Sequence, residues 1–496
     1  MDKLKLVRNI VTGFVGQFIV IILGLILPRL FIDSYGSDLN GLLSTITQIF
    51  AYMALLEAGI GTASQNALYK SFQEKNKTEI SEIISSTKEY FKRFTEIYAL
   101  GVILLSLGLP FLLKTNVDPI IIFFIVLLEG MSGVVSFYFV ETIVILLNVD
   151  GKSYVNNTIN LLNKIIGCIA KIVMIILGLN IVILQLVYFL IIILKVVFYK
   201  IYFRKKYNWI KSTKNAKKLK LKDKNSYILT EICWTIFSST DMIVLSIFVS
   251  TEMSSVYGIY SMIFTNISLL INAVYMSIIY VLGYTYHESI EKYTVVHDAY
   301  NSIFIGFTTV LMSVCYVLTI PFVELYTCGV TDVNYIYPSL PIMFCLIQLL
   351  SWSRYVSGNL TGIAGYAKKT SYISLVEALI NLSLSIVLVK KLGIVGVTLA
   401  TVIALPVKVM WCTYVADKKV IHRSYWKSLS IIGVNFLFFF AVVFVSHMYR
   451  PIINTYSQFL IWGVLLTALF SVMGMGLNII VNRECWQVVR RYILKG

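Results

Sequence analysis

The stretch IVILQLVYFLIIILKVVFYKIYFRKKYNWIKSTKNAKKLKLKDK, residues 181–224, joins an apolar run to a dense basic run. Residues 181–198 carry a single charged side chain, Lys195. An apolar run of about 18 residues or more is long enough to cross the hydrocarbon core of a bilayer as a helix. Basic residues that directly follow a span favour the cytoplasmic side of the membrane. The stretch therefore predicts a membrane-spanning helix that ends in the cytoplasm.

The composition indicates that such helices make up most of the chain. Of the 496 residues, 58% are hydrophobic and only 14% are charged, whereas soluble chains carry roughly 25% charged residues. Most of the basic residues behind the net charge of +17 lie in the connections between apolar runs, which argues against a nucleic-acid partner. The seven cysteines show no CxxC spacing, so neither a metal site nor a disulfide framework is expected.

Apolar windows and their breakers predict about fourteen spans. The first six lie at roughly 8–31, 40–66, 93–114, 118–147, 153–178 and 181–203. The second six lie at roughly 227–249, 255–284, 300–321, 338–363, 370–390 and 394–416, followed by a terminal pair at 428–448 and 456–482. Because basic residues precede the first span and it is too long for a signal peptide, it is expected to be retained.

The distribution of basic residues orients these spans. The even-numbered connections and the C-terminal tail are rich in Lys and Arg, whereas the odd-numbered ones carry acids such as Asp118, Glu252 and Glu324. Lys390 and Lys391 are the exception. The alternation places both termini in the cytoplasm.

A faint repeat at an offset of roughly 215 residues indicates a duplicated unit. Gly41 aligns with Gly258, Gly151 with Gly365, and the LGL ending at Leu179 with the LGI ending at Ile394. A repeat of six helices gives two lobes of the same orientation, related by a pseudo-two-fold axis along the membrane normal. The predicted organisation is an N-lobe, a basic cytoplasmic linker, a C-lobe, and a final helix pair with a cytoplasmic tail, at 1–203, 204–226, 227–418 and 419–496.

The sequence PRLFIDSYGSDLNGLLSTITQIFAYMALLEAGIGTAS, residues 28–64, resembles the opening of Wzx-type polysaccharide flippases. These belong to the multidrug, oligosaccharidyl-lipid and polysaccharide exporter superfamily. SSTDMIVLSIF, residues 238–248, and the following VYGIYSM resemble the same family's seventh and eighth helices. The resemblance implies two six-helix lobes around a central cavity, alternating access, and an undecaprenyl-diphosphate-linked glycan as cargo. Fourteen spans are common in this branch, whereas multidrug relatives usually have twelve.

Charged side chains inside the spans are the candidate functional residues, because a charge at mid-bilayer costs about 2.5–3.5 kcal/mol on insertion scales. The candidate substrate-binding cations are Arg29, Lys164, Lys171, Arg354 and Lys408. Lys164 and Lys171 are two helical turns apart on one face and together suit a diphosphate. The alternatives are snorkelling for Arg29 and Lys408 and an internal salt bridge for Arg354.

Acidic residues inside the spans are about as numerous as the cations. Glu129, Asp241 and Glu57 are the candidates for coupling transport to Na⁺ or H⁺, and otherwise they serve as structural partners of the cations. No cofactor is expected beyond that coupling ion.

The predicted function is export of a lipid-linked O-antigen, capsule or related repeat unit from the cytoplasmic to the outer leaflet of a bacterial inner membrane. We expect this export to be driven by an ion gradient or by the membrane potential. The expected state is a monomer among membrane lipids, with no nucleic-acid partner and with other polysaccharide-assembly proteins as further candidate partners. The alternative is a cation-coupled multidrug exporter of the same fold. A polytopic glycosyltransferase or polymerase is disfavoured because the external connections are short and offer little catalytic apparatus, so the chain is not expected to be an enzyme.

Overall fold

The computed structural model describes residues 3–57, 60–210, 235–236 and 239–482. The chain divides into two compact units, Met1–Ser255 and Val256–Gly496, called here the N-unit and the C-unit. The described residues form helices and connections without any strand, which confirms the predicted all-α membrane fold. Most of the predicted linker 204–226 and part of the predicted span 227–249 lie outside the described residues, as does the end of the C-terminal tail.

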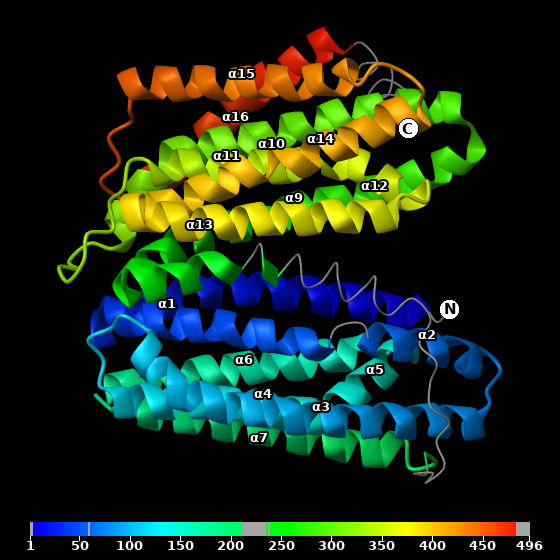
Figure 1. Cartoon of the computed structure of the whole chain (residues 1–496), viewed down its shortest axis with the longest axis vertical. Coiled ribbons are helices and arrows are strands. Elements are labelled where there is room, and N and C mark those ends of the chain that lie inside the picture. Colours follow the sequence, from blue (N-terminus) through cyan, green and yellow to red (C-terminus); the bar gives the residue numbers. More distant parts are fainter. Residues whose placement is uncertain (1–2, 58–59, 211–234, 237–238, 483–496) are drawn as a thin grey trace. The chain divides into compact units, whose positions relative to one another are not determined.

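The N-unit begins with a long helix that reverses direction. Its helices are α1 (Lys3–Ala54), η1 (Leu55–Glu57), α2 (Ile60–Gln73), α3 (Lys77–Leu112), α4 (Pro119–Phe139), α5 (Glu141–Val149), α6 (Ser153–Ile176) and α7 (Ile181–Lys206), and a short apolar helix covers Ser239–Phe248. Within α1, Gly36 has φ 82° and ψ 167°, a region that only glycine adopts readily. Figure 1 shows the two halves of α1 side by side as a result.

The C-unit also contains a long helix that reverses direction. It contains most of α9 (Thr251–Glu288), then α10 (Ile290–Tyr326), α11 (Leu340–Ser353), α12 (Tyr355–Ile363), α13 (Ala367–Ala404), α14 (Pro406–Tyr414), η2 (Val415–Val420), α15 (Trp426–Met448) and α16 (Tyr456–Val481). Gly393, with φ 56° and ψ −131°, turns the chain inside α13.

Ten helices among the described residues are long and apolar enough to cross a membrane. Two of these ten contain a turn, at Gly36 and Gly393, and therefore supply two spans each. Together α11 and α12 form one further span that is interrupted at Arg354, and Ser239–Phe248 belongs to another. Thirteen of the fourteen predicted spans thus have a counterpart among the described residues, and the seventh, 227–249, is described only in part.

The glycines aligned by the sequence repeat share an unusual conformation. Gly151 and Gly365 have φ of 68° and 82°, and Gly178 and Gly393 have φ of 65° and 56°. A positive φ is costly for residues with a Cβ atom. The agreement at two of the three aligned positions supports an ancestral duplication.

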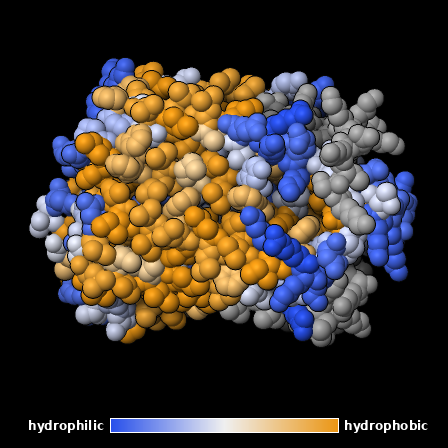
Figure 2. Space-filling model, turned by 90° about the horizontal axis from the view of Figure 1, so that it is seen from below, coloured by the Kyte–Doolittle hydropathy of each residue, from blue (hydrophilic) through white to orange (hydrophobic). Residues whose placement is uncertain are grey.

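The surface has the polarity that a membrane protein requires. On the face drawn in Figure 2, apolar side chains cover the middle of the helices and hydrophilic ones gather towards their ends. Large apolar side chains such as Phe111, Leu437 and Val472 are exposed to 87%, 71% and 76%. Hydrocarbon is the solvent that suits them.

Small and polar side chains bring helices of the N-unit into close contact. The Asn40 amide donates to Ser255 Oγ at 2.8 Å, and the hydroxyls of Thr45 and Ser246 are 2.6 Å apart. A Cβ atom at Gly41 would lie only 1.7 Å from the carbonyl oxygen of Thr251. Such contacts drive helix association in lipid, where the hydrophobic effect is absent.

We expect Gly41→Ala to destabilise the protein by about 1–3 kcal/mol or more, because the new methyl group must displace backbone atoms. Gly24→Ala, in the same helix, is the matched control, since a Cβ atom added there would have no other atom within 4 Å. Thermal unfolding of the purified protein measures the difference. Equal stability of the two variants would show that the contact at Gly41 is unimportant.

Candidate functional site

Lys171 of α6 is a charged side chain held among aromatic rings in the N-unit. Its ammonium lies 4.4 Å from the ring centre of Tyr188 on α7 and 5.5 Å from that of Phe31 on α1. Gly167, one turn earlier, makes room for Tyr188, whose ring would lie 3.2 Å from a Cβ atom there. Cation–π contacts of this kind contribute about 0.5–2 kcal/mol each. They offset part of the desolvation of Lys171.

Glu129 of α4 is the negative charge that acts most strongly on Lys171. Among the described residues, no carboxylate lies within ion-pair distance of the Lys171 ammonium. Tyr98 of α3, which is buried, also lies within the field of Glu129. Lys171 and Glu129 therefore attract each other without forming a salt bridge. An anion can interact with Lys171 without first breaking such a bridge.

Lys164 has different surroundings from Lys171 although the two share a helix face. Its side chain is exposed, and its charge acts on Lys195 of α7. Lys195 in turn interacts with Glu141 at the start of α5, and Glu141 with Glu57. Lys164 and Lys171 therefore belong to two separate groups of charges, although they lie seven residues apart on one face of α6.

Two other predicted residues of the N-unit have local partners. Arg29 Nε forms an ion pair with Asp33 Oδ2 at 3.0 Å, one turn along α1. Asp241 is buried, with 3% of its surface exposed, and its charge acts on Tyr52 of α1. The Tyr52 hydroxyl also contacts the hydroxyl of Thr240. Arg29 and Asp241 thus belong to surroundings other than those of Lys171.

From the sequence, Arg354 of the C-unit is either a substrate-binding cation or part of an internal salt bridge. The structure contains the salt bridge. Arg354 Nη1 lies 2.5 Å from Glu377 Oε1, and the two side chains are 6% and 5% exposed. Arg354 is the residue between α11 and α12, with φ −86° and ψ −12°. Lys408 of α14 also acts on Glu377. The structure therefore brings together Arg354 and Lys408 from the predicted set.

Aromatic rings pack beside this ion pair. The rings of Trp352 and Tyr355 are 4.3 Å apart, and Tyr275 meets Tyr355 edge-on at 5.0 Å. The Trp352 indole donates to Gln348 Oε1 at 3.0 Å. Of these rings, Tyr355 lies close enough to Arg354 and Glu377 for both charges to act on its phenol.

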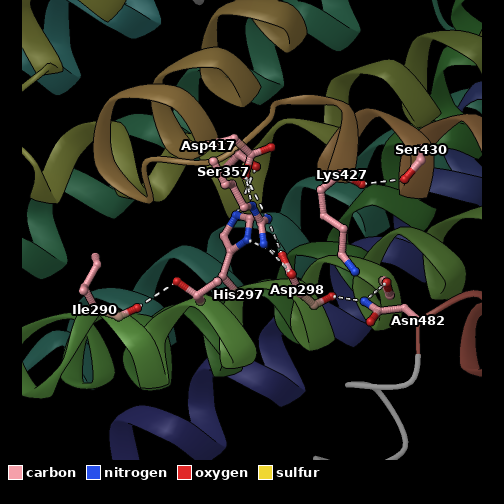
Figure 3. A network of polar contacts seen from close by, with 11 residues as sticks. Ile290, His297, Asp298, Ser357, Asp417, Lys427, Ser430 and Asn482 are labelled. Carbon is pink, nitrogen blue, oxygen red and sulfur yellow. Dashed lines mark hydrogen bonds and ion pairs between the residues drawn. The ribbon is translucent and has the colours of Figure 1, made fainter.

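A cluster around Arg423 is not predictable from the sequence. His297 lies inside α10, next to Asp298 (Figure 3). Asp298 binds Arg423, which in the sequence is only one of the basic residues that orient the spans. The two are 125 residues apart in the sequence, and no local pattern links them.

Comparison with known proteins establishes the fold. No protein-family model matches the sequence, and no curated protein matches it. A lipid II flippase MurJ, in an inward closed conformation, is 17% identical with a TM-score of 0.64, over 94% of this chain and 98% of that one. An inward-facing multidrug resistance MATE family transporter of the MOP superfamily is 13% identical with a TM-score of 0.63, over 82% and 97%. A MOP superfamily transporter from Pyrococcus furiosus is 13% identical with a TM-score of 0.58, over 85% and 96%.

Breaking the Arg354–Glu377 pair is expected to be costly. Arg354→Met leaves a buried carboxylate, and Glu377→Leu leaves a buried guanidinium, so each should lower the free energy of unfolding by about 3–5 kcal/mol. The double variant removes both charges and should be much closer to wild type. Thermal or denaturant unfolding measures the coupling. Additive losses in the double variant would contradict the pair.

Proposed function

We propose that this chain is a flippase of the Wzx kind, which moves an undecaprenyl-diphosphate-linked oligosaccharide from the cytoplasmic to the outer leaflet of a bacterial inner membrane. The observation that supports this most is Lys171, a cation inside the spans that has aromatic rings and a more distant carboxylate as its surroundings. Such a group suits an anionic headgroup. The shared fold with a lipid II flippase is consistent with a lipid-linked cargo.

Lys171 is the proposed diphosphate contact because its charge is already desolvated. The ammonium can donate to phosphate oxygens, and charge-assisted bonds of this type are stronger than neutral ones. When the diphosphate arrives, it replaces Glu129 as the dominant negative charge near Lys171. When it leaves, Glu129 resumes that role. Glu129 thus prevents Lys171 from being left without any opposite charge between cargoes.

The remaining predicted cations have secondary roles in this proposal. Lys164, which is exposed on the same helix, first attracts the diphosphate towards Lys171. Arg29 and Arg354 must exchange Asp33 and Glu377 for the cargo if they bind it, whereas Lys408 can assist that exchange by holding Glu377. Lys171 and Lys164 are therefore the first residues to test.

Energy for export comes from the membrane potential and from a coupling ion. An interior-negative potential helps to expel an anion, by about 2.3 kcal/mol per charge per 100 mV. Glu129, Asp241 and Glu57 are the proposed carriers of the returning Na⁺ or H⁺. Glu129 has the most direct link, since it shares an electrostatic environment with the proposed diphosphate contact.

Replacing both lysines should abolish transport. We expect Lys164→Ala/Lys171→Ala to lower flipping in proteoliposomes at least about tenfold, because each charge-assisted hydrogen bond contributes about 1.5–3 kcal/mol. Lys92→Ala, on the exposed surface of α3, is the matched control. Wild-type transport by the double variant, at equal amounts of inserted protein, would refute the assignment of these lysines.

Neutralising Glu129 should separate the two sources of energy. Glu129→Gln is expected to retain transport driven by an imposed membrane potential and to lose its stimulation by an imposed Na⁺ or H⁺ gradient. Proteoliposomes with each gradient applied alone provide the measurement. A variant that keeps full ion stimulation would exclude Glu129 as the coupling site.

The second candidate is a cation-coupled multidrug exporter, which the interaction between Glu57 and Glu141 favours. Two neighbouring carboxylates suit a cationic drug. Such an exporter would transport lipophilic cations, and its activity would require Glu57 and Glu141 but not Lys171. Transport of an anionic lipid-linked substrate with dependence on Lys171 distinguishes the flippase.

A further inference from the structure

Asp38 connects three segments of the chain at one end of the N-unit. It lies at the start of the second half of α1, just after the turn at Gly36. Its Oδ1 accepts a hydrogen bond from the Thr115 hydroxyl at 2.9 Å, and its Oδ2 accepts one from the backbone N–H of Asn116 at 2.8 Å. The hydroxyl of Thr251, the first residue of α9, also donates to Oδ1. We call these four hydrogen-bonded residues, Asp38, Thr115, Asn116 and Thr251, the Asp38 latch.

Lys114 adds main-chain hydrogen bonds to the latch. Its N–H donates to the carbonyl oxygen of Ser246 at 2.9 Å, and its carbonyl oxygen accepts from the N–H of Thr251 at 3.0 Å. Its ammonium donates to the carbonyl oxygen of Phe248 at 2.7 Å. The last carbonyl oxygens of a helix have no partner within that helix. Lys114 therefore caps the end of the short helix Ser239–Phe248.

The three segments are all connections that the predicted topology places outside the cell. Asp38 follows the first predicted span, residues 113–118 separate the third from the fourth, and Thr251 separates the seventh from the eighth. Odd-numbered connections are external when the N-terminus is in the cytoplasm. Their meeting at one end of the N-unit agrees with that topology, so the latch lies at the external end.

The latch lies where the two sequence repeats touch. The start of α9 belongs to the second repeat and the whole of α1 to the first. Asn40 and Ser255, whose side chains form a hydrogen bond of 2.8 Å, are 215 residues apart, which matches the offset of the repeat. Asp38 and Thr251 are 213 residues apart. Residues related by a two-fold axis can touch only where both lie next to the axis. The contact therefore lies at the pseudo-two-fold axis that relates the repeats.

Small side chains close the structure at this point of the axis. Thr45, Ser246 and Ser254 are each 0% exposed. Ser246 Oγ lies 2.6 Å from the hydroxyl oxygen of Thr45 and 2.7 Å from that of Ser254. A Cβ atom at Gly41 would lie 1.7 Å from the carbonyl oxygen of Thr251. These described groups pack too closely to leave room for a cargo, so a passage along the axis is closed at its outer end.

The chemistry of the contact suits opening as well as closure. Small hydroxyl and amide side chains can separate without the steric barrier that large interdigitated side chains impose. Asp38 is partly exposed, so water can replace each donor that leaves its carboxylate. A buried pair such as Arg354 and Glu377 lacks this property, because its separation leaves two buried charges without partners.

We propose that the Asp38 latch is the outer gate of the transporter, and this inference rests on the proposed flippase function. While Asp38 holds Thr115, Asn116 and Thr251, the outer end is closed and the cargo can enter only from the cytoplasmic side. Release of these donors separates the start of α9 from the second half of α1 and lets the glycan-bearing headgroup leave outwards. Asp38 acts by holding helices together rather than by binding the cargo.

The reactivity of a cysteine placed beside the latch tests the gate without any cargo. Ser254→Cys, in a background without the native cysteines, is treated with a membrane-impermeant thiosulfonate outside right-side-out vesicles. We expect Asp38→Ala to raise the labelling rate at least about tenfold, because three hydrogen bonds to a charged acceptor are lost. Asn116→Ala is the matched control, since it keeps the backbone N–H that donates to Asp38. Equal labelling rates of the two variants would overturn the proposal.

A second variant keeps the test decisive if Asp38→Ala does not fold. Thr251→Val preserves the shape of the side chain and removes one donor to Asp38. It should raise the labelling rate of Ser254→Cys about threefold or more. A labelling rate equal to that of Asn116→Ala would contradict the gate.

A cross-link tests whether transport requires the latch to open. Asn40→Cys/Ser255→Cys places thiols at two positions whose side chains are hydrogen-bonded at 2.8 Å, and copper phenanthroline oxidises the two thiols to a disulfide. The cross-linked protein should lose transport of the lipid-linked diphosphate, and dithiothreitol should restore it. Asn40→Cys alone, treated in the same way, is the control.

Full transport by the cross-linked protein would refute the gate. If the reduced protein moves no lipid-linked cargo, the proposed flippase function fails, whereas the labelling of Ser254→Cys still decides whether the latch closes the outer end. The two failures are therefore distinguishable.

Discussion

A charged side chain within the hydrocarbon region must find an opposite charge, an aromatic face or water, and this constraint organises both units. Arg354 and Glu377 satisfy it with a closed, buried pair, and Arg29 does so with Asp33 one turn away. Lys171 satisfies it differently, with the rings of Tyr188 and Phe31 and a carboxylate that stays at a distance. Because Lys171 has no closed ion pair among the described residues, it is the charge that we propose exchanges partners during transport.

The sequence was sufficient to predict the spans, because hydropathy and breakers are local properties. Gly36 and Gly393 turn the chain inside long helices, at the boundaries that the apolar windows indicated. The repeat was also detectable, since the aligned Gly178 and Gly393 both need a positive φ. In each case the signal lies within a few residues of the structure that it predicts.

Partner choice was not predictable in the same way. The spacing of Lys164 and Lys171 places them on one helix face, but neighbouring helices give them different surroundings. Arg423 illustrates the same limit, because its partner Asp298 comes from a distant helix. Likewise, the fold shared with flippases and drug transporters does not identify the cargo. Cargo selection depends on the side chains that packing brings together.

If Lys171 contacts the cargo, a water-borne anion must be able to reach it from within the protein. The direct measurement is the reactivity of a cysteine introduced as Lys171→Cys towards a charged, membrane-impermeant thiosulfonate, in a background in which the native cysteines are replaced. We expect labelling of this cysteine, and we expect a lipid-linked diphosphate to suppress it. Absence of labelling from either side of the membrane, in folded protein, would show that position 171 is sealed and that Lys171 does not bind the cargo.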